Sequence, residues 1–405
     1  MLPRDGSITD LFLGLVSIPS PSGRERALGE QVRDWLAAAG VPAQFDGSGA
    51  RNHSDAGNLV AAADGAPGAP RLLFVAHLDT VESGEPAVRP VLGDDGIIRS
   101  ASDTILGADN KSAVAAVMRL CAAVRRMPAT RRAPLAAAFT CREESGRMGA
   151  GFLDLAGLGV DCAFCVDGAQ PIGTVITRAL GQTTFELTVR GRAAHAAAAP
   201  ERGVDAIAVA AEIVGALPLG RLPAGGSANV AAIVGGSVID RLDRAEDRGP
   251  GTGAGGLARA ALAAAPTNSV PDIAHLRGEI RGFTVAEIEA TVAEVGAVAE
   301  RVCAARGARY QLRRDRSRMI PPLPGRPDSR ALSLVRTAAA GVAGVRFAAT
   351  EAHATLEANH LAAAADVVAV ASGGRDPHQR SESIAVAELE QLEALLTGIA
   401  VAAAA

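Results

Sequence analysis

Apolar and polar positions follow two different periods in the first part of the chain. Residues 8–39 carry apolar positions at helical spacing, broken at 19–21, and residues 24–39 predict an amphipathic helix that ends near Gly40. A second helix is predicted at 111–126, with basic residues in its last turn, where the helix dipole favours positive charge. Short apolar runs predict buried strands at 58–62, 71–76, 134–140 and 161–166. Strands that alternate with helices predict an α/β fold with a mostly parallel sheet.

The pattern changes near residue 180. Strict alternation of apolar and polar residues predicts half-exposed strands, and helical patterns separate them. The predicted strands are 183–191, 229–236, 274–283 and 308–316, and the predicted helices are 203–217 and 285–307. The earlier pattern of buried strands and helices returns with an apolar run at 365–371 and a closing helix from 387. We therefore expect an α+β domain inserted at 180–316, and a larger α/β domain made of residues 1–179 and 317–405.

One segment of the inserted domain has no clear period. Residues 240–266 begin with a run of charges and continue with five closely spaced glycines. Such a composition predicts a flexible, exposed loop, either a tolerated surface insertion or a functional cover for a site.

Composition narrows the class of protein. The chain has 405 residues, which suggests two domains, and a net charge of -4 with no basic block, so nothing indicates a nucleic-acid partner. The N-terminal residues lack the pattern of a signal peptide, and no apolar run is long enough to span a bilayer, so we expect a cytoplasmic protein without membrane contact.

The five cysteines do not suggest a disulfide framework, because their number is odd and small. Cys162 and Cys165 form a C-x-x-C within a predicted strand. Residues three apart on a strand point to opposite faces, so the pair is poorly placed to share a metal ion, and we expect both to be buried structural residues.

Acidic and imidazole side chains follow three of the predicted buried strands. His77 and Asp79 come after the first, Glu143 and Glu144 after the second, and Asp167 after the third. The carboxyl ends of parallel strands are where α/β sheets bind ligands. Several charged groups delivered to one edge need partners, and metal ions are the usual ones.

Each of these residues also has a simpler explanation. His77 and Asp79 could form a turn, Asp109 in GADNKSA could cap a helix, and Asp167 before Gly168 could belong to a turn. Adjacent Glu143 and Glu144 are harder to explain, because neighbouring carboxylates repel one another unless a cation lies between them. Taken together, the nitrogen and oxygen donors predict two divalent cations, with Zn²⁺ favoured and Co²⁺ or Mn²⁺ as substitutes. The chain has no G-x-S-x-G and no P-loop.

At this point the chain resembles the M20 metallopeptidase family, in particular its peptidase T-like and aminoacylase-like members. The resemblance rests on segments that follow the family order over nearly the whole chain. These segments are AHLDTV, LGADNKSAVAAV, FTCREESGRMGA, CVDGAQPIG, VRGRAAHAAAAPERGVDAIAVAAEIV, TNSVPD with LRGEIRGF, and RDPHQRSESI.

The resemblance implies a role for each site residue. His77 and Asp167 would bind one metal ion, Glu144 and His378 the other, and Asp109 would bridge the two. Asp79 would hold His77, and Glu143 would be the general base that takes a proton from the bridging water. The fold implied is a zinc-exopeptidase-like catalytic domain with an inserted lid and dimerisation domain at 180–316.

Three residues of the inserted domain acquire roles only through the resemblance. His195 would polarise the scissile carbonyl in the partner subunit of a homodimer, although without the resemblance a solvent-facing loop histidine would be the preferred interpretation. Arg281 would bind a substrate carboxylate, and Asn229 would add a hydrogen bond.

The chain departs from the family pattern at HATLEANHL. Glu357 stands where an aspartate is expected, and Ala354 and Thr355 replace glycines. His353 and His360 flank the segment and are interpreted as structural more readily than as substrate contacts. We expect intact hydrolytic residues with an altered choice of substrate.

The sequence therefore predicts a metal-dependent hydrolase of peptide or N-acyl amino acid amide bonds. Two alternatives stay open: a specialised amide hydrolase of a biosynthetic pathway, and a non-catalytic relative that binds an amino-acid-like ligand.

Overall fold

A computed structural model describes residues 2–3, 6–81, 86–146, 149–236, 262–263 and 265–404. The predicted glycine-rich loop at 240–266 lies outside the described residues, apart from 262–263 and 265–266. The chain divides into two compact units. Unit 1 comprises Met1–Ala179, Leu323–Ala352 and Leu356–Ala405, and unit 2 comprises Leu180–Pro322 and His353–Thr355.

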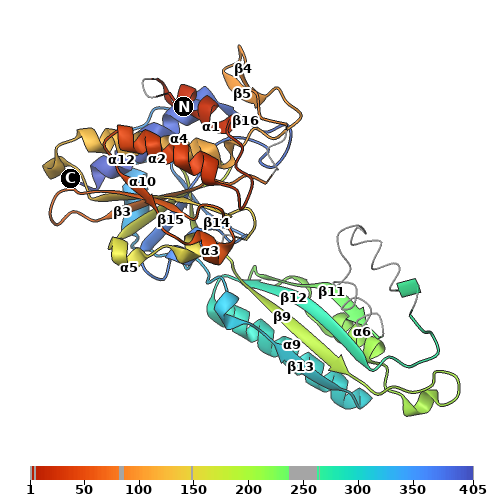
Figure 1. The fold of residues 1–405 in the computed structure, drawn as a ribbon. Coiled ribbons are helices and arrows are strands. Elements are labelled where there is room, and N and C mark those ends of the chain that lie inside the picture. The colour runs from red at the N-terminus through yellow and green to blue at the C-terminus, as the bar shows by residue number, and fades with distance from the viewer. Residues whose placement is uncertain are drawn as a thin grey trace. The chain divides into compact units, whose positions relative to one another are not determined.

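Unit 1 is built on an eight-stranded mixed sheet (Figure 1). Its strands in spatial order are β1 (Ala43–Phe45), β2 (Leu59–Ala63), β6 (Leu135–Thr140), β3 (Leu72–His77), β7 (Cys162–Val166), β15 (Asp366–Val370), β8 (Thr174–Ala179) and β14 (Ala348–Ala352). The four central strands from β6 to β15 are parallel, and β8 with β14 forms another parallel pair. This confirms the α/β class with a mostly parallel sheet.

Helices cover this sheet unequally. The longer helices pack with one face in the main hydrophobic core, and short helical turns lie with the residues of the other face. The longer helices are α1 (Ile8–Val16), α2 (Arg26–Ala38), α4 (Ala108–Arg126), α10 (Arg330–Ala340) and α12 (Val386–Ala402). The short helices on that other face are α5 (Leu155–Leu158) and α11 (Ala358–Leu361), whereas α3 (Gly49–Asn52) contributes no residue to either core. A three-stranded sheet of β16 (Ser383–Ala385), β5 (Ile97–Ser100) and β4 (Pro90–Leu92) completes the unit.

The central strands are buried on both faces, as their continuous apolar runs predict. Phe74 stacks on Phe164 of the neighbouring strand, with ring centroids 4.9 Å apart. Cys162 belongs to the core on one face of the sheet and Cys165 to the core on the other. All five cysteines are free and buried, which confirms the structural interpretation of the C-x-x-C.

Unit 2 is an antiparallel sheet whose core-facing side packs with two helices. The strands in spatial order are β10 (Gly220–Arg221), β11 (Ser227–Gly235), β12 (Ile273–Gly282), β9 (Gly181–Arg190) and β13 (Arg309–Arg313), and the helices are α6 (Ala206–Ala216) and α9 (Val285–Arg306). The sequence prediction ends this domain at residue 316. The unit runs on to Pro322, because Ile320 exchanges two backbone hydrogen bonds with Gln182, each 2.9 Å long.

In the part of the chain that the structure describes, the connecting segments contain four short 3₁₀ turns, at Ala129–Arg131, Ala150–Phe152, Pro200–Arg202 and Arg316–Arg318. Among the described residues, no helix has both the length and the apolar character that crossing a membrane requires.

Candidate metal centre

The strands of unit 1 bring the predicted ligands to one edge of the sheet. His77 is the last residue of β3 and lies beside Thr140, the last residue of β6, in parallel register. Asp167 follows the last residue of β7, which is the other neighbour of β3. Glu143 and Glu144 follow β6 within the next few residues. Because the three strands end at the same level, their following side chains meet, as the sequence pattern predicts.

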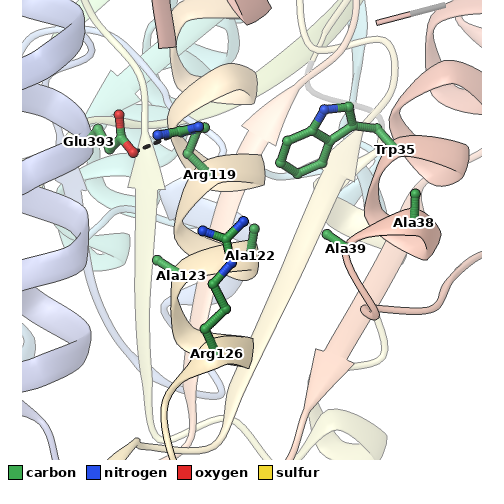
Figure 2. Close-up of a pocket in the computed structure, with 8 residues that line it drawn as sticks. All are labelled: Trp35, Ala38, Ala39, Arg119, Ala122, Ala123, Arg126 and Glu393. Atoms are coloured by element: carbon green, nitrogen blue, oxygen red, sulfur yellow. Dashed lines mark hydrogen bonds and ion pairs between the residues drawn. The ribbon is translucent and has the colours of Figure 1, made fainter. Parts of the chain in front are cut away.

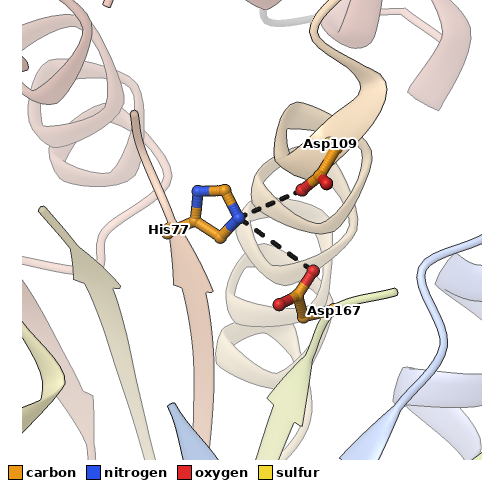
Figure 3. Close-up of side chains that lie close together, drawn as sticks. All are labelled: His77, Asp109 and Asp167. Atoms are coloured by element: carbon orange, nitrogen blue, oxygen red, sulfur yellow. Dashed lines mark hydrogen bonds and ion pairs between the residues drawn. The ribbon is translucent and has the colours of Figure 1, made fainter. Parts of the chain in front are cut away.

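Asp109 reaches the same place from the beginning of α4. Asn110 donates a side-chain hydrogen bond to the carbonyl oxygen of Val166 (2.8 Å), which ties the helix start to the end of β7. Gly107, with a φ of 78°, is the N-cap of α4, so the side chain of Asp109 does not cap the helix. Its Oδ1 lies 3.1 Å from Nε2 of His77, and an oxygen of Asp167 lies 4.0 Å from the same nitrogen (Figure 3).

A second group forms around His378, on the loop between β15 and β16. Its Nε2 lies 2.9 Å from Oε1 of Glu144 and 3.4 Å from Oδ2 of Asp109. His378 has a φ of 65°, and its side chain is 47% exposed, whereas the side chain of His77 is 1% exposed.

The donor atoms therefore form overlapping groups. One donor atom from each of His77, Asp109 and Asp167 lies within 4.8 Å of the others, and the same holds for Asp109, Glu144 and His378. Asp109 belongs to both groups. A third group with this spacing joins His77 to Glu143 and Glu144.

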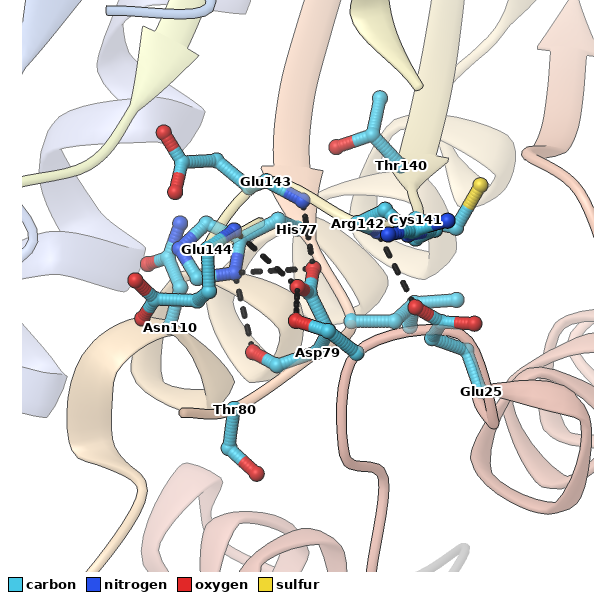
Figure 4. A network of polar contacts seen from close by, with 12 residues as sticks. Glu25, His77, Asp79, Thr80, Asn110, Thr140, Cys141, Arg142, Glu143 and Glu144 are labelled. Atoms are coloured by element: carbon cyan, nitrogen blue, oxygen red, sulfur yellow. Dashed lines mark hydrogen bonds and ion pairs between the residues drawn. The ribbon is translucent and has the colours of Figure 1, made fainter. Parts of the chain in front are cut away.

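Asp79 holds several of these groups in place (Figure 4). Its backbone oxygen lies 3.0 Å from Nδ1 of His77, so this nitrogen donates and Nε2 faces Asp109. Its two carboxylate oxygens accept the backbone N–H groups of Glu143 (2.9 Å) and Glu144 (3.1 Å), and the hydroxyl of Ser22 donates to one of them. Asp79 thus orients the His77 ring through its backbone oxygen, and the loop that carries both glutamates through its carboxylate.

Glu25 extends this network and was missed by the sequence analysis (Figure 4). It is completely buried, and its Oε1 accepts the backbone N–H of Gly23 (2.7 Å) and of Arg142 (3.1 Å). Its Oε2 accepts the hydroxyl of Ser54 at 2.7 Å. Arg142 has a φ of 57°, a strained conformation for a side chain with a Cβ atom. Glu25 therefore anchors the residue that precedes Glu143. A single glutamate within a predicted helix gives no signal of this role.

Burial and neighbouring charges shift the pKa values of the proposed metal ligands. Burial raises the pKa of Asp167 well above its usual range, and the negative charge of Asp109 adds to this effect. Burial likewise raises the pKa of Glu144 to about 7. The hydrogen bond to Asp109 raises the pKa of His378 to about 9, against the effect of burial. Burial alone would lower the pKa of His77, but hydrogen bonds to Asp109 and Asp79 raise it well above its usual range.

These shifts show that the cluster holds more carboxylates than its two imidazoles can neutralise. Protons must supply the missing positive charge when no other cation does. Imidazole nitrogens and carboxylate oxygens at this spacing are donors that divalent transition metals and zinc prefer. The residues present therefore fit a pair of divalent cations.

The remaining predicted site residues lie in unit 2. His195 is exposed, and its Nδ1 accepts the backbone N–H groups of Ala197 and Ala198, both at 3.2 Å, so its Nε2 is a hydrogen-bond donor. Arg281 lies on β12 and donates from Nε to Glu279 at 2.7 Å. Asn229 lies on β11, opposite Glu279, with an exposed side chain.

The divergent segment contributes a buried carboxyl to unit 1. Glu357 is 3% exposed and accepts a hydrogen bond from the hydroxyl of Thr140 at 3.0 Å. Burial raises its pKa to about 8. His353 belongs to unit 2, where its Nδ1 lies 3.0 Å from a guanidinium nitrogen of Arg221 and its ring meets that of Phe283 edge-on. His360 is partly buried, with its ring beside Gly151.

A separate cavity of about 250 Å³ lies against α2 and α4 (Figure 2). Alanine side chains line much of it, and an ion pair between Arg119 and Glu393, 2.9 Å long, lies at its edge. None of the residues of the metal cluster lines this cavity.

Comparison with known proteins agrees with the geometry. The model of peptidase family M20/M25/M40 matches residues 73–402. The chain belongs to this family. Its members are hydrolases, so the chain is an M20 hydrolase, as the sequence motifs predict.

Three similar proteins illustrate the extent of the similarity. The uncharacterized protein YqjE of Bacillus subtilis strain 168 is 27% identical over 74% of this chain and 73% of its own length. The crystal structure of aminopeptidase PepT from Bacillus cereus ATCC 10987 has a TM-score of 0.83 and 25% identity, over 98% of each chain. The YXEP protein of Bacillus subtilis, described as a dinuclear metal-binding peptidase of the M20 family, has a TM-score of 0.66 and 16% identity, over 97% of this chain and 96% of its own.

Proposed function

We propose that this M20 protein is a dinuclear metal-dependent hydrolase that cleaves amide bonds of short peptides or N-acyl amino acids. The observation that carries the proposal is the pair of donor groups that share Asp109, with Glu143 next to both. The similarity to the aminopeptidase PepT and to YXEP, a dinuclear metal-binding peptidase, supports it.

His77, Asp109 and Asp167 would hold one cation, and Asp109, Glu144 and His378 the other. Three carboxylates and two imidazoles suit Zn²⁺, with Co²⁺ or Mn²⁺ as replacements. When bound, the two cations would polarise the scissile carbonyl group and make water a stronger acid.

Glu143 would act as the general base. It is buried, and its backbone is held by the carboxylate of Asp79. From this position it would take a proton from the attacking water and deliver it to the amine that leaves. Asp79 would keep the His77 ring in the tautomer that presents Nε2, because its carbonyl oxygen accepts the proton on Nδ1.

The residues of unit 2 would act on the substrate. His195 would donate from Nε2 to the scissile carbonyl oxygen, since its Nδ1 is already occupied as an acceptor. Arg281, oriented by Glu279, would bind a substrate carboxylate, and Asn229 would contribute a hydrogen bond.

We further propose that the protein is a homodimer that associates through unit 2. Among the described residues, β10 pairs with β11 only at Ser227 and Ala228, and the outer edge of the rest of β11 has no partner strand. Ile233 on this strand is 47% exposed, and Ile207 on α6 is 39% exposed. An unpaired strand edge beside exposed apolar side chains is suited to a second copy of the same surface.

The assembly is tested by sedimentation of the wild type, of Ile233→Asp and of Val401→Asp. Val401 is exposed to a similar degree, 48%, but lies in unit 1. We expect dimers for the wild type and for Val401→Asp, and monomers for Ile233→Asp. A fully active monomeric wild type would refute the proposed role of His195 across subunits.

The reaction is tested by a hydrolysis screen over di- and tripeptides and N-acyl amino acids, with added zinc, cobalt or manganese and a chelator control. Glu143→Gln should keep its bound metal and lose activity by about a hundredfold or more. Glu144→Gln should instead lose metal. Unchanged turnover in Glu143→Gln would exclude its role as the base. Metal binding without turnover of any substrate would favour a specialised amide substrate or a binding protein.

A further inference from the structure

The loop that carries His378 is held by few packing contacts of its own. Its neck is closed by Arg375 and Ser383, which exchange backbone hydrogen bonds of 2.8 and 3.2 Å. Within the loop, Asp376 and His378 both have positive φ angles, 53° and 65°, and the side chain of His378 is 47% exposed. Packing alone therefore does not fix this ligand.

Glu382 is the buried exception in this loop. It is 2% exposed, although the neighbouring Arg380 and Ser381 are exposed. Its carboxylate lies at the start of α4, where Oε2 accepts the backbone N–H of Gly107 (2.7 Å) and Oε1 accepts that of Asp109 (2.9 Å). A carboxylate at this end of a helix is also favoured by the helix dipole.

A buried lysine lies near this carboxylate. Lys111, in the first turn of α4, is 2% exposed and donates from Nζ to the carbonyl oxygen of Ile18 at 2.7 Å. Its charge interacts favourably with that of Glu382. The carboxylate is therefore held by two backbone N–H groups, and its own chain continues directly into β16.

We propose that Glu382 is a positioning residue that sets the distance between Asp109 and His378, and so completes the second of the two proposed metal positions. One carboxylate binds the amide of Asp109 and belongs to the loop of His378, so it links two ligands that are far apart in sequence. This inference rests on the proposed dinuclear centre.

The two metal positions depend on Glu382 to different degrees. His77 ends a buried strand and Asp167 follows one, so two of the three ligands of the first position stay in place without Glu382. The third, Asp109, is also tied to the end of β7 through the side chain of Asn110. The second position needs His378, whose loop is anchored by Glu382 and, at the surface, by contacts of Arg380 with Asp103. Loss of Glu382 should thus weaken the second position selectively.

The experiment is a cobalt titration of metal-free, full-length protein, followed by visible absorption and calorimetry. The variants are Glu382→Asp, which keeps the charge opposite Lys111 but cannot reach both amides, and Glu382→Gln. Glu388→Gln is the matched control, because Glu388 also accepts a nearby backbone N–H, that of Ala385 at 2.9 Å, and lies 4.0 Å from Arg375 at the neck of the same loop, but is not hydrogen-bonded to Asp109.

We expect the wild type and Glu388→Gln to bind two equivalents of cobalt. Both Glu382 variants should bind the first equivalent as the wild type does and the second about 10- to 100-fold more weakly, with an altered absorption spectrum for the second ion. Thermal melting of the metal-free proteins checks that the variants are folded.

Two results would overturn the inference. The first is a second equivalent bound as tightly by folded Glu382 variants as by the wild type. The second is equal weakening of both equivalents together with a lower melting temperature than Glu388→Gln, which would make Glu382 a general structural residue. A wild type that binds fewer than two cobalt ions would instead refute the dinuclear proposal itself.

Discussion

The two halves of the candidate metal centre are built in different ways. His77 ends a strand that is buried along its whole length, whereas His378 lies on a loop and is 47% exposed. The first half is rigid because the sheet around it is packed on both faces. In the second half, the loops that carry Glu144 and His378 are held by buried carboxylates that accept backbone N–H groups. Ligand geometry can thus come from core packing or from hydrogen bonds to the backbone.

The largest effects should come from removing one histidine from each half. His77→Ala leaves the buried Asp79 and the partly buried Asp109 without this imidazole partner, so we expect a loss of about 3 kcal/mol in the free energy of unfolding and loss of the first metal equivalent. His378→Ala should change stability by less than about 1 kcal/mol, because its pairs are partly exposed, and should lose only the second equivalent.

Urea unfolding of the metal-free proteins, combined with cobalt titration, measures both quantities. We call the half around His77 the packed half, because core packing holds it, and the half around His378 the tethered half, because hydrogen bonds to buried carboxylates hold it. Equal destabilisation by the two substitutions would contradict this contrast.

Between pH 8.5 and 6.5, the affinity for the second cobalt ion, which His378 would bind, should fall by about a hundredfold. The pKa of His378 is raised to about 9, so below that pH a metal ion must displace its proton, and affinity should fall about tenfold per pH unit. Below about pH 7 the fall should steepen, because the raised pKa of Glu144 adds a second proton.

The stability of the metal-free protein should change with pH in the opposite direction to the metal affinity. The folded-state pKa of His378 lies above its unfolded value, so its contribution to stability is complete below about pH 6.5 and is lost as pH rises through 9. Calorimetric titrations with cobalt at several pH values measure the first effect, and melting curves of wild type and His378→Gln measure the second. A pH-independent cobalt affinity would rule out His378 as a ligand.

A smaller effect should follow from Glu25→Gln. The amide group can keep its oxygen for the N–H groups of Gly23 and Arg142 only by turning its NH2 toward Ser54, whose hydroxyl oxygen already accepts two backbone N–H groups. The loop before Glu143 would therefore loosen. We expect kcat to fall about tenfold, with KM and metal content close to those of the wild type. Glu30→Gln, an exposed change on the same helix, is the control. Loss of metal in Glu25→Gln would show that Glu25 supports the whole centre and not only this loop.

The sequence predicted the packed half of the site better than the tethered half. Continuous apolar runs revealed the buried strands, and the acidic or imidazole residues after them followed directly. His378 and the pairing of ligands came only from the resemblance to a known family. Glu25 and Glu382 were not found, because each is a single glutamate whose burial depends on contacts with residues far away in the sequence.

Parts of the fold were missed for a similar reason. β14 has the sequence AATEA and is mostly exposed, so it carries no apolar pattern and forms only through its parallel pairing with β8. α10 has a clear apolar face, with Leu334 and Val335 buried, but the sequence analysis assigned no separate helix there. The alternating strands of unit 2 were found because one face of each is buried and the other is not.

Because the cysteines are buried, their reaction with thiol reagents can report when the surrounding structure opens. Burial raises the pKa of Cys121 and Cys141 to about 12, so their thiolates are scarce and their thiols are protected from modifying reagents until the chain around them opens. Four of the five cysteines lie in unit 1, and Cys303 lies in unit 2. The rate of alkylation at each thiol, read by mass spectrometry, would therefore time the opening of each unit separately, without any added label.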